Sequence, residues 1–274
     1  PLANPGGVMV DLEAIAKIAH DAEVPQMVDN TMATPWLCRP FEWGADLVVH
    51  STTKFLSGQG NAMGGIVIDS GRFPWFGNAK YPSLSEPCPD YNGLTFAETF
   101  GDMAFTLYSH AVSLRDLGCT QSPMNAWITL NGVETLPLRM ERHVENAHKL
   151  AGFLLQHKAV QWVSYAGLSS SPYHQLAQKY LQGKAGSVFT FGIRGGYESG
   201  LRVLEKVELF SHVSNIGDSR SLILHPASTT HRQLSDEQRL TAGAGPEMIR
   251  LSVGIESAED LIADLEQALE LSLI

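Results

Sequence analysis

Apolar residues recur along the first third of the chain in patterns that predict alternating helices and strands. Asp11 is placed to cap a helix whose apolar positions follow the three-and-four spacing of one helical face: Leu12, Ile15, Ala16 and Ala19. Short apolar runs at 24–29, 45–50 and 65–69 predict strands, because turn-forming residues separate them. Strands separated by short helices or loops are typical of an α/β layer with a mainly parallel sheet.

The rest of the chain predicts a long loop and then a second group of elements. Residues 71–100 are rich in Pro, Gly, Ser and aromatic residues, which favours a long ordered surface loop. A long helix is expected over 135–156, because its apolar residues form one stripe: Leu136, Met140, Val144, Ala147, Leu150 and Leu154. Alternation at 187–193 and 248–253 predicts strands, 200–207 predicts a helix, and a capped acidic helix follows Ser257. We therefore predict two units, 1–133 and 134–274, with the second entered through the long helix and built as a smaller α/β domain.

Composition excludes several classes of function. The net charge is −10 over 274 residues and no run of Lys or Arg occurs, which argues against nucleic acid as a partner. No apolar stretch approaches the roughly 20 residues of a membrane span, and the N-terminus lacks the pattern of a signal peptide. The histidines and cysteines lack the spacing of zinc ligands. We therefore expect a cytosolic protein without a membrane partner and without a metal.

A lysine follows the second predicted strand at a position where ligands bind. Ligands of open α/β sheets bind beyond the carboxyl ends of the strands, and Lys54 falls there, where its amine could form an imine. Ser51 and Thr53 could hydrogen-bond a phosphate, and the glycine-rich stretch 58–65 would let the chain pass close to a ligand. Taken alone, this stretch is equally compatible with a solvated loop lysine.

Two further charged residues complement that lysine. Asp29 ends the first predicted strand, and a carboxylate beside a pyridine nitrogen keeps the nitrogen protonated, as pyridoxal phosphate requires. Arg250 interrupts an apolar alternation, and a guanidinium binds a carboxylate through two parallel hydrogen bonds, so it could anchor an amino acid. The alternatives are a turn or helix-cap role for Asp29 and a structural ion pair for Arg250.

Three stretches together carry a resemblance to a known family. They are Val-Asp-Asn-Thr at 28–31, the run 45–58 around Lys54, and the stretch 221–231 that contains His-Pro-Ala-Ser-Thr-Thr-His. The chain resembles, over essentially its whole length, the Cys/Met-metabolism family of fold-type I pyridoxal-phosphate enzymes, and within it the O-acetylhomoserine sulfhydrylases. The resemblance implies an α/β fold in which residues 1–133 belong to the cofactor-binding large domain, incomplete at its N-terminal side, and 134–274 form the small domain.

The resemblance also assigns a role to each candidate residue. Lys54 matches the lysine that binds pyridoxal phosphate as an imine and acts as the base, and Asp29 matches the partner of the pyridine nitrogen. The remaining roles are phosphate binding by Ser51 and Thr53, approach to the ring hydroxyl by Asn4, and substrate binding by Arg250 with its neighbour Ser221.

The implied reaction is γ-replacement on O-acetylhomoserine by sulfide or a small thiol, which gives homocysteine and acetate, in a homotetramer built from dimers. Two departures from the family bear on it. The phosphate loop, the ring-stacking tyrosine and the N-terminal arm of the family do not occur, so we expect the chain to be a C-terminal portion of a longer protein. Arg220 stands where many relatives have an acidic residue, so the substrate preference of those relatives cannot be assigned to this chain in full. The alternatives are a γ-lyase or γ-synthase acting on methionine or cystathionine, and a non-catalytic fragment that acts only in assembly.

Overall fold

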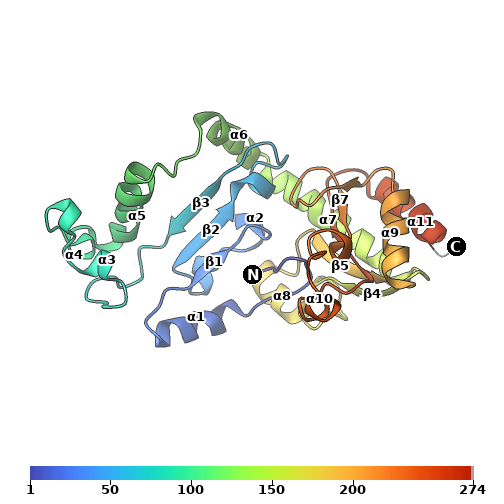
Figure 1. Ribbon diagram of the computed structural model, residues 1–274, viewed down its shortest axis with the longest axis horizontal. Coiled ribbons are helices and arrows are strands. Elements are labelled where there is room, and N and C mark those ends of the chain that lie inside the picture. The colour runs from blue at the N-terminus through green and yellow to red at the C-terminus, as the bar shows by residue number, and fades with distance from the viewer. Residues whose placement is uncertain (273–274) are drawn as a thin grey trace.

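Two β-sheets joined by a long helix make up the chain. A computed structural model describes residues 1–272. Figure 1 shows the three-stranded sheet near the middle of the molecule, the five-stranded sheet towards the C-terminal end, and the helix α7 (Leu136–Gln156) running between them. The predicted α/β class is confirmed.

The three-stranded sheet has the order β1-β2-β3 and is mixed. Its strands are β1 (Met27–Asp29), β2 (Leu47–Ser51) and β3 (Gly65–Asp69). β1 pairs with β2 in parallel and β3 pairs with β2 antiparallel, so the prediction of a mainly parallel sheet was wrong for the described residues. Residues 52–64 join β2 to β3 and begin with a helical turn, so the chain reverses direction over a short distance.

Helices cover only part of this sheet. Asp11 caps α1 (Leu12–Asp21) by accepting from the backbone N–H of Ala14, as predicted. Leu12 and Ala16 are buried, whereas Ile15, also predicted to face the core, is exposed. The short elements α2 (Thr34–Leu37) and η1 (Pro40–Trp43) connect β1 to β2.

The segment 71–100 is ordered, as predicted, but it is partly helical rather than one long loop, and the helical elements continue to residue 116. They are α3 (Pro82–Ser85), η3 (Pro89–Tyr91), α4 (Phe96–Phe100), η4 (Gly101–Met103), α5 (Ala104–Tyr108) and η5 (Ser109–Asp116). These elements form a lobe far from the five-stranded sheet (Figure 1). A separate cluster around Phe73, Trp75 and Phe96 forms its core. Aromatic residues bury large apolar areas, so this short segment has a core of its own.

The five-stranded sheet has the order β4-β5-β8-β7-β6. Its strands are β4 (Val160–Ser164), β5 (Val188–Ile193), β8 (Met248–Ser252), β7 (Leu222–Leu224) and β6 (Ser211–His212). All its pairings are antiparallel except β6 with β7. The remaining helices of this half are α8 (His174–Leu181), α9 (Gly196–Lys206), η6 (Pro226–Ser228), α10 (Asp236–Thr241) and α11 (Ala258–Ser272).

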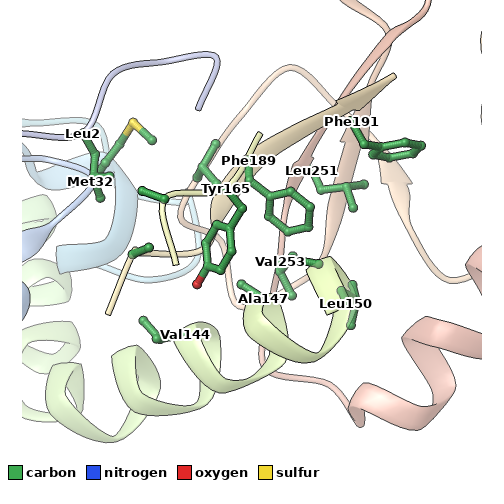
Figure 2. Packing of buried hydrophobic residues seen from close by; sticks show 14 of the residues in the cluster. Leu2, Met32, Val144, Ala147, Leu150, Tyr165, Phe189, Phe191, Leu251 and Val253 are labelled. Carbon is green, nitrogen blue, oxygen red and sulfur yellow. The ribbon is translucent and has the colours of Figure 1, made fainter. Parts of the chain in front are cut away.

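The main core lies between α7 and the five-stranded sheet. All six residues of the predicted apolar stripe of α7 are buried, and Leu150 and Leu154 are fully inaccessible. Figure 2 shows Phe189, Leu251 and Val253 of the sheet region facing α7. The same cluster includes Leu2, Met32 and Phe55, so one continuous core links the two predicted units, whose boundary remains a prediction. No helix among residues 1–272 has the length and apolar character needed to cross a membrane.

Candidate active site

A cavity of about 380 Å³ brings three of the predicted site residues together. Asn4, Lys54 and Arg250 line it, and they come from the N-terminal segment, the turn after β2, and β8. The other lining residues are Pro5, Ser214, Asn215, Ile216, Pro226, Thr230, His231 and Ala242. Cavities of this size accept small ligands and cofactors.

Lys54 lies on a π-helical turn, η2 (Thr52–Leu56), directly after β2. Its Nζ donates to Oδ1 of Asn215. The backbone leaves helical geometry at Lys54, whereas the next two residues, Phe55 and Leu56, are buried in the main core. The amine therefore extends into the cavity from a backbone that the core fixes.

Arg139 of α7 holds this turn from behind. Its Nη1 donates to the carbonyl of Phe55 at 2.7 Å, and its Nη2 donates to the carbonyl of Gly132 at 2.6 Å. Gly132 lies in α6 (Pro123–Glu134), and a Cβ there would come within 2.3 Å of the Leu56 carbonyl oxygen. The close approach of α6 thus requires glycine, and the guanidinium ties the carbonyl of the turn to that of α6.

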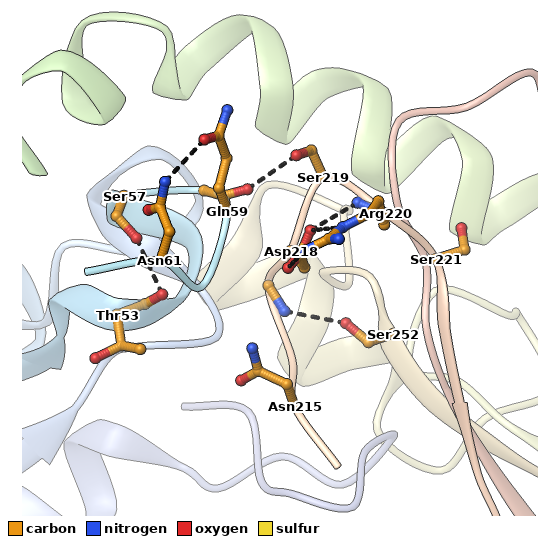
Figure 3. A network of polar contacts seen from close by, with 12 residues as sticks. Thr53, Ser57, Gln59, Asn61, Asn215, Asp218, Ser219, Arg220, Ser221 and Ser252 are labelled. Carbon is orange, nitrogen blue, oxygen red and sulfur yellow. Dashed lines mark hydrogen bonds and ion pairs between the residues drawn. The ribbon is translucent and has the colours of Figure 1, made fainter. Parts of the chain in front are cut away.

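The segment 215–221 holds the turn from the other side (Figure 3). The backbone N–H of Ser219 donates to the Gly58 carbonyl at 2.8 Å, and the Ser219 hydroxyl donates to it at 3.0 Å. Gly217 packs against Phe55 with φ of +72°, and a Cβ there would lie 2.7 Å from the Phe55 nitrogen. Only glycine suits both the conformation and the contact.

Arg250 connects the remaining polar groups of the cavity. Its Nη1 donates to Oδ1 of Asn4 at 3.0 Å, and its Nη2 donates to the backbone oxygen of Asn215 at 3.0 Å. Asn215 therefore contacts Lys54 through its side chain and Arg250 through its backbone. Arg250 is buried, and its contacts are to neutral oxygens, so it is not in the structural ion pair that was the alternative reading.

Burial and charge both act on the lysine amine. Burial lowers the pKa of Lys54 from its ordinary value, and the positive charge of Arg250 lowers it further. Each effect disfavours the protonated amine. A lysine must lose its proton to act as a nucleophile or a base, so the cavity favours both roles.

Asp29, Ser51 and Thr53 lie at the same edge of the three-stranded sheet but do not line the cavity. The backbone N–H of Ser51 donates to Oγ1 of Thr31 at 2.8 Å, which ties the end of β2 to the residues after β1. The Asp29 side chain is exposed and accepts from the Thr31 N–H at 2.9 Å. Thr53 exchanges hydrogen bonds with the backbone of Gly64, at 3.1 and 3.3 Å. Their predicted roles remain predictions.

Ser221 does not reach the cavity. It is fully buried, its hydroxyl donates to Glu256 at 2.9 Å, and it accepts from the Gly254 N–H at 2.8 Å. Its side chain stabilises the segment 215–221 rather than facing Lys54. Arg220, the departure from the family pattern, pairs with the buried Asp218 at 3.0 Å.

Sequence reasoning missed Asn215 and Arg139, which hold the amine and its turn. Neither lies in a motif: Asn215 is 161 positions from Lys54, and Arg139 is one of several charged residues on a helix. A signal in the sequence was Gly217, two residues after Asn215, because a glycine there allows close packing against Phe55.

The side chains that line the cavity fit pyridoxal phosphate. Lys54 supplies an amine with a lowered pKa for covalent attachment, and Arg250 supplies a fixed positive charge. Asp29 and Ser51 end the neighbouring strands β1 and β2, and a carboxylate and a hydroxyl are groups that this cofactor uses. The donor set thus matches the functional groups of the cofactor.

Comparison with known proteins supplies independent evidence of the family. The family model described as "Cys/Met metabolism PLP-dependent enzyme" matches residues 1–270. The chain is 49% identical over 269 residues to O-acetyl-L-homoserine sulfhydrylase 1 of Thermus thermophilus, covering 98% of this chain and 64% of that protein. It is 46% identical over 273 residues to homocysteine synthase of Schizosaccharomyces pombe, covering 99% of this chain and 64% of that protein.

A solved structure is similar throughout. The crystal structure of a Campylobacter jejuni protein, provisionally named O-acetylhomoserine (thiol)-lyase, matches with a TM-score of 0.93 and 42% identity. The match covers 98% of this chain and 64% of that one, and that structure contains a pyridoxyl-lysine 5'-monophosphate. The chain thus spans 64% of the length of each of these three relatives. The chain belongs to the Cys/Met-metabolism family of pyridoxal-phosphate-dependent enzymes.

Proposed function

We propose that this chain is the part of a pyridoxal-phosphate enzyme that replaces the γ-substituent of O-acetylhomoserine with sulfide, giving homocysteine and acetate, or with a small thiol, giving the corresponding thioether and acetate. One observation carries the proposal: the amine of Lys54 and the guanidinium of Arg250 line the same cavity, both in contact with Asn215. Relatives named for this activity, at 42–49% identity over nearly the whole chain, support the choice of substrate.

Arg250 binds the α-carboxylate of the substrate. Its two terminal nitrogens already point at oxygen acceptors, on Asn4 and Asn215, so the guanidinium is oriented before a ligand arrives. A planar guanidinium forms two parallel hydrogen bonds with a carboxylate, which fixes both position and direction. The α-carbon is thereby held close to Lys54.

Lys54 binds the cofactor covalently and, once displaced by the amino group of the substrate, moves protons between the α- and β-carbons. A general base works best with a pKa near the working pH, and burial together with Arg250 lowers the pKa of this amine in that direction. Pyridoxal phosphate, when bound, supplies the electron sink for the negative charge that proton removal leaves on carbon. Asp29 keeps the pyridine nitrogen protonated, and Ser51 and Thr53 bind the phosphate.

Mass spectrometry tests the attachment. The complete protein is reduced with borohydride and digested, and we expect the pyridoxyl group on Lys54 alone. Lys54→Ala should remove the label and homocysteine formation, whereas Lys158→Ala, at an exposed lysine outside the cavity, should retain both. Normal homocysteine formation by the Lys54 variant would refute the proposal.

Product analysis separates the alternatives. A replacement enzyme forms homocysteine only when sulfide is present. A γ-lyase instead yields an oxo acid and ammonia in the absence of sulfide. A protein that neither retains the pyridoxyl group nor releases acetate would be the non-catalytic assembly module. The homotetramer remains a prediction from the family resemblance, and the cytosolic location remains a prediction from the pattern of the chain.

A further inference from the structure

The cavity contains a second side chain that can accept a proton, the imidazole of His231. Among its lining residues, Lys54, Arg250 and His231 have ionisable side chains. Arginine stays protonated in proteins, so proton transfer within the cavity is left to Lys54 and His231. Imidazole is the side chain whose ordinary pKa lies closest to neutrality.

The proposed reaction leaves a task that Lys54 cannot perform. Lys54 takes a proton from the substrate and must hold it until it returns it to carbon, so it is already protonated when the sulfur nucleophile arrives. The thiolate, not the thiol, attacks carbon, and a thiol whose pKa lies above the working pH, as that of free cysteine does at about 8.5, arrives mostly protonated. Another group therefore has to accept the thiol proton.

The turn 225–231 fixes His231 at the cavity. Its backbone N–H donates to the Pro226 carbonyl at 2.9 Å, and the Thr229 hydroxyl donates to the His225 carbonyl at 2.8 Å. The buried His225 anchors the turn, because its Nε2 lies 2.8 Å from the Pro246 carbonyl oxygen. His225 is thus a packing residue, whereas His231 lines the cavity.

The imidazole of His231 has one nitrogen engaged and one available. Nδ1 lies 2.9 Å from the hydroxyl oxygen of Thr230. A hydroxyl can accept from Nδ1–H, which leaves the lone pair on Nε2. Nε2 has no hydrogen-bond partner among the side chains and backbone groups that the structure describes, which exclude the Asp236 side chain and residues 273–274.

We propose that Nε2 of His231 accepts the proton of the incoming thiol or hydrogen sulfide, an inference that rests on the proposed function. The S–H bond breaks, its proton goes to Nε2, and the sulfur electron pair forms a bond to the substrate γ-carbon, which acetate has already left with its own electron pair. The electron pair displaced from the γ-carbon is taken up through the cofactor, and the proton held by Lys54 then adds to carbon. His231 afterwards releases its proton to water, so atoms and charge balance.

The test separates the two halves of the reaction in the complete holoenzyme. His231→Gln keeps a polar side chain of similar size, and His110→Gln, at an exposed histidine outside the cavity, is the matched control. We expect acetate release from O-acetylhomoserine without thiol to be the same in all three proteins. Formation of the methyl thioether of homocysteine, which is methionine, from methanethiol should fall about 100-fold in the His231 variant alone, the usual size of a general-base effect.

The pH profile distinguishes proton transfer from a structural role. In the His231 variant the rate should rise about tenfold per pH unit up to the thiol pKa, because only preformed thiolate reacts, and the loss should shrink at high pH. An unchanged profile, or equal loss of acetate release and thiol addition, would overturn the proposal. Absence of acetate release in the unaltered protein would overturn the proposed function instead.

Chemical modification supplies a measurement that does not depend on activity. Diethyl pyrocarbonate, applied to the cofactor-free protein and followed by mass spectrometry, should modify His231 and spare His225. A His231 that resists the reagent would show that Nε2 is closed to the cavity, and the proposal would fail even if the reaction itself is as proposed.

Discussion

The two sheets of this chain are equally apolar in sequence but differ in how they are covered. Every residue of β5 and of β8 is buried, whereas four of the five residues of β3 are exposed, including Val67 at 54%. The helices α7 and α9 pack on the five-stranded sheet, and nothing comparable covers β3 among residues 1–272. An apolar strand is therefore not by itself a buried strand, because burial depends on which element packs against it.

The difference matters for the site, which lies where the two sheets meet. Arg250 comes from β8, a strand fixed by neighbours on both sides, and Lys54 follows β2 of the more exposed sheet. Arg139 of α7 and the segment 215–221 connect the turn of Lys54 to the well-packed half. The amine is thus positioned mainly by the C-terminal half.

The largest expected effect is in the core of the five-stranded sheet. Phe189 belongs to β5, the strand between β4 and β8, and its side chain is fully buried. Phe189→Ala should lower the free energy of unfolding by about 3–5 kcal/mol, because it removes apolar contacts and leaves a cavity. Urea unfolding monitored by circular dichroism measures it. A loss below 1 kcal/mol would show that this sheet is no better packed than the other.

A pH-dependent effect follows from the buried His143 of α7. Burial lowers its pKa from 6.5 to about 4, and its Nδ1 lies 2.6 Å from the Val253 carbonyl oxygen. The unfolded chain binds a proton below pH 6.5 that the folded chain binds only near pH 4, so stability falls as the pH drops through this window. The loss attributable to His143 is about 3 kcal/mol at pH 4.

His143→Gln isolates that contribution. The variant should lose less stability than the unaltered protein between pH 7 and pH 4, measured by urea unfolding at each pH, because glutamine does not titrate. Parallel stability curves for the two proteins would contradict the assignment.

A smaller effect, on the pKa of Lys54, is expected in the cavity where the two sheets meet. Arg250→Gln removes the positive charge that lowers the pKa of Lys54, so the pKa of the amine should rise and its unprotonated fraction at pH 8 should fall. Lys54 in the cofactor-free protein should then react several-fold more slowly with acetic anhydride, with exposed Lys158 as the internal reference. Faster or equal labelling of Lys54 would show that Arg250 does not act on it.

The smallest effect is expected on the exposed face of β3. Val67→Thr keeps the β-branched shape and should change the free energy of unfolding of this chain by no more than about 0.5 kcal/mol, because the side chain is already in contact with water. Thermal and urea unfolding measure it. A cost comparable to that of Phe189→Ala would remove the contrast between the sheets.

Local patterns predicted the elements that have strong periodicity. The helix α7 begins within one residue of its predicted start and β3 has its predicted bounds, because both depend on the residues within them. β4, α8 and β7 were missed: β7 is only three residues long, and β4 and α8 gain most of their order from packing against neighbours. Propensity is a weak guide to such short elements.

The sequence by itself determined which chemistry the protein can perform. Lys54 after an apolar strand, Asp29 before it and Arg250 within another strand are side chains suited to pyridoxal phosphate and an amino-acid substrate, and their family likeness could be seen without coordinates. Only the tertiary structure decided that Lys54, Asn215 and Arg250 share one cavity, that Ser221 stays outside it, and that His231 enters it. The reason is physical: these segments are far apart in the chain, and contacts between distant segments depend on how sheets and helices pack, which no local pattern encodes.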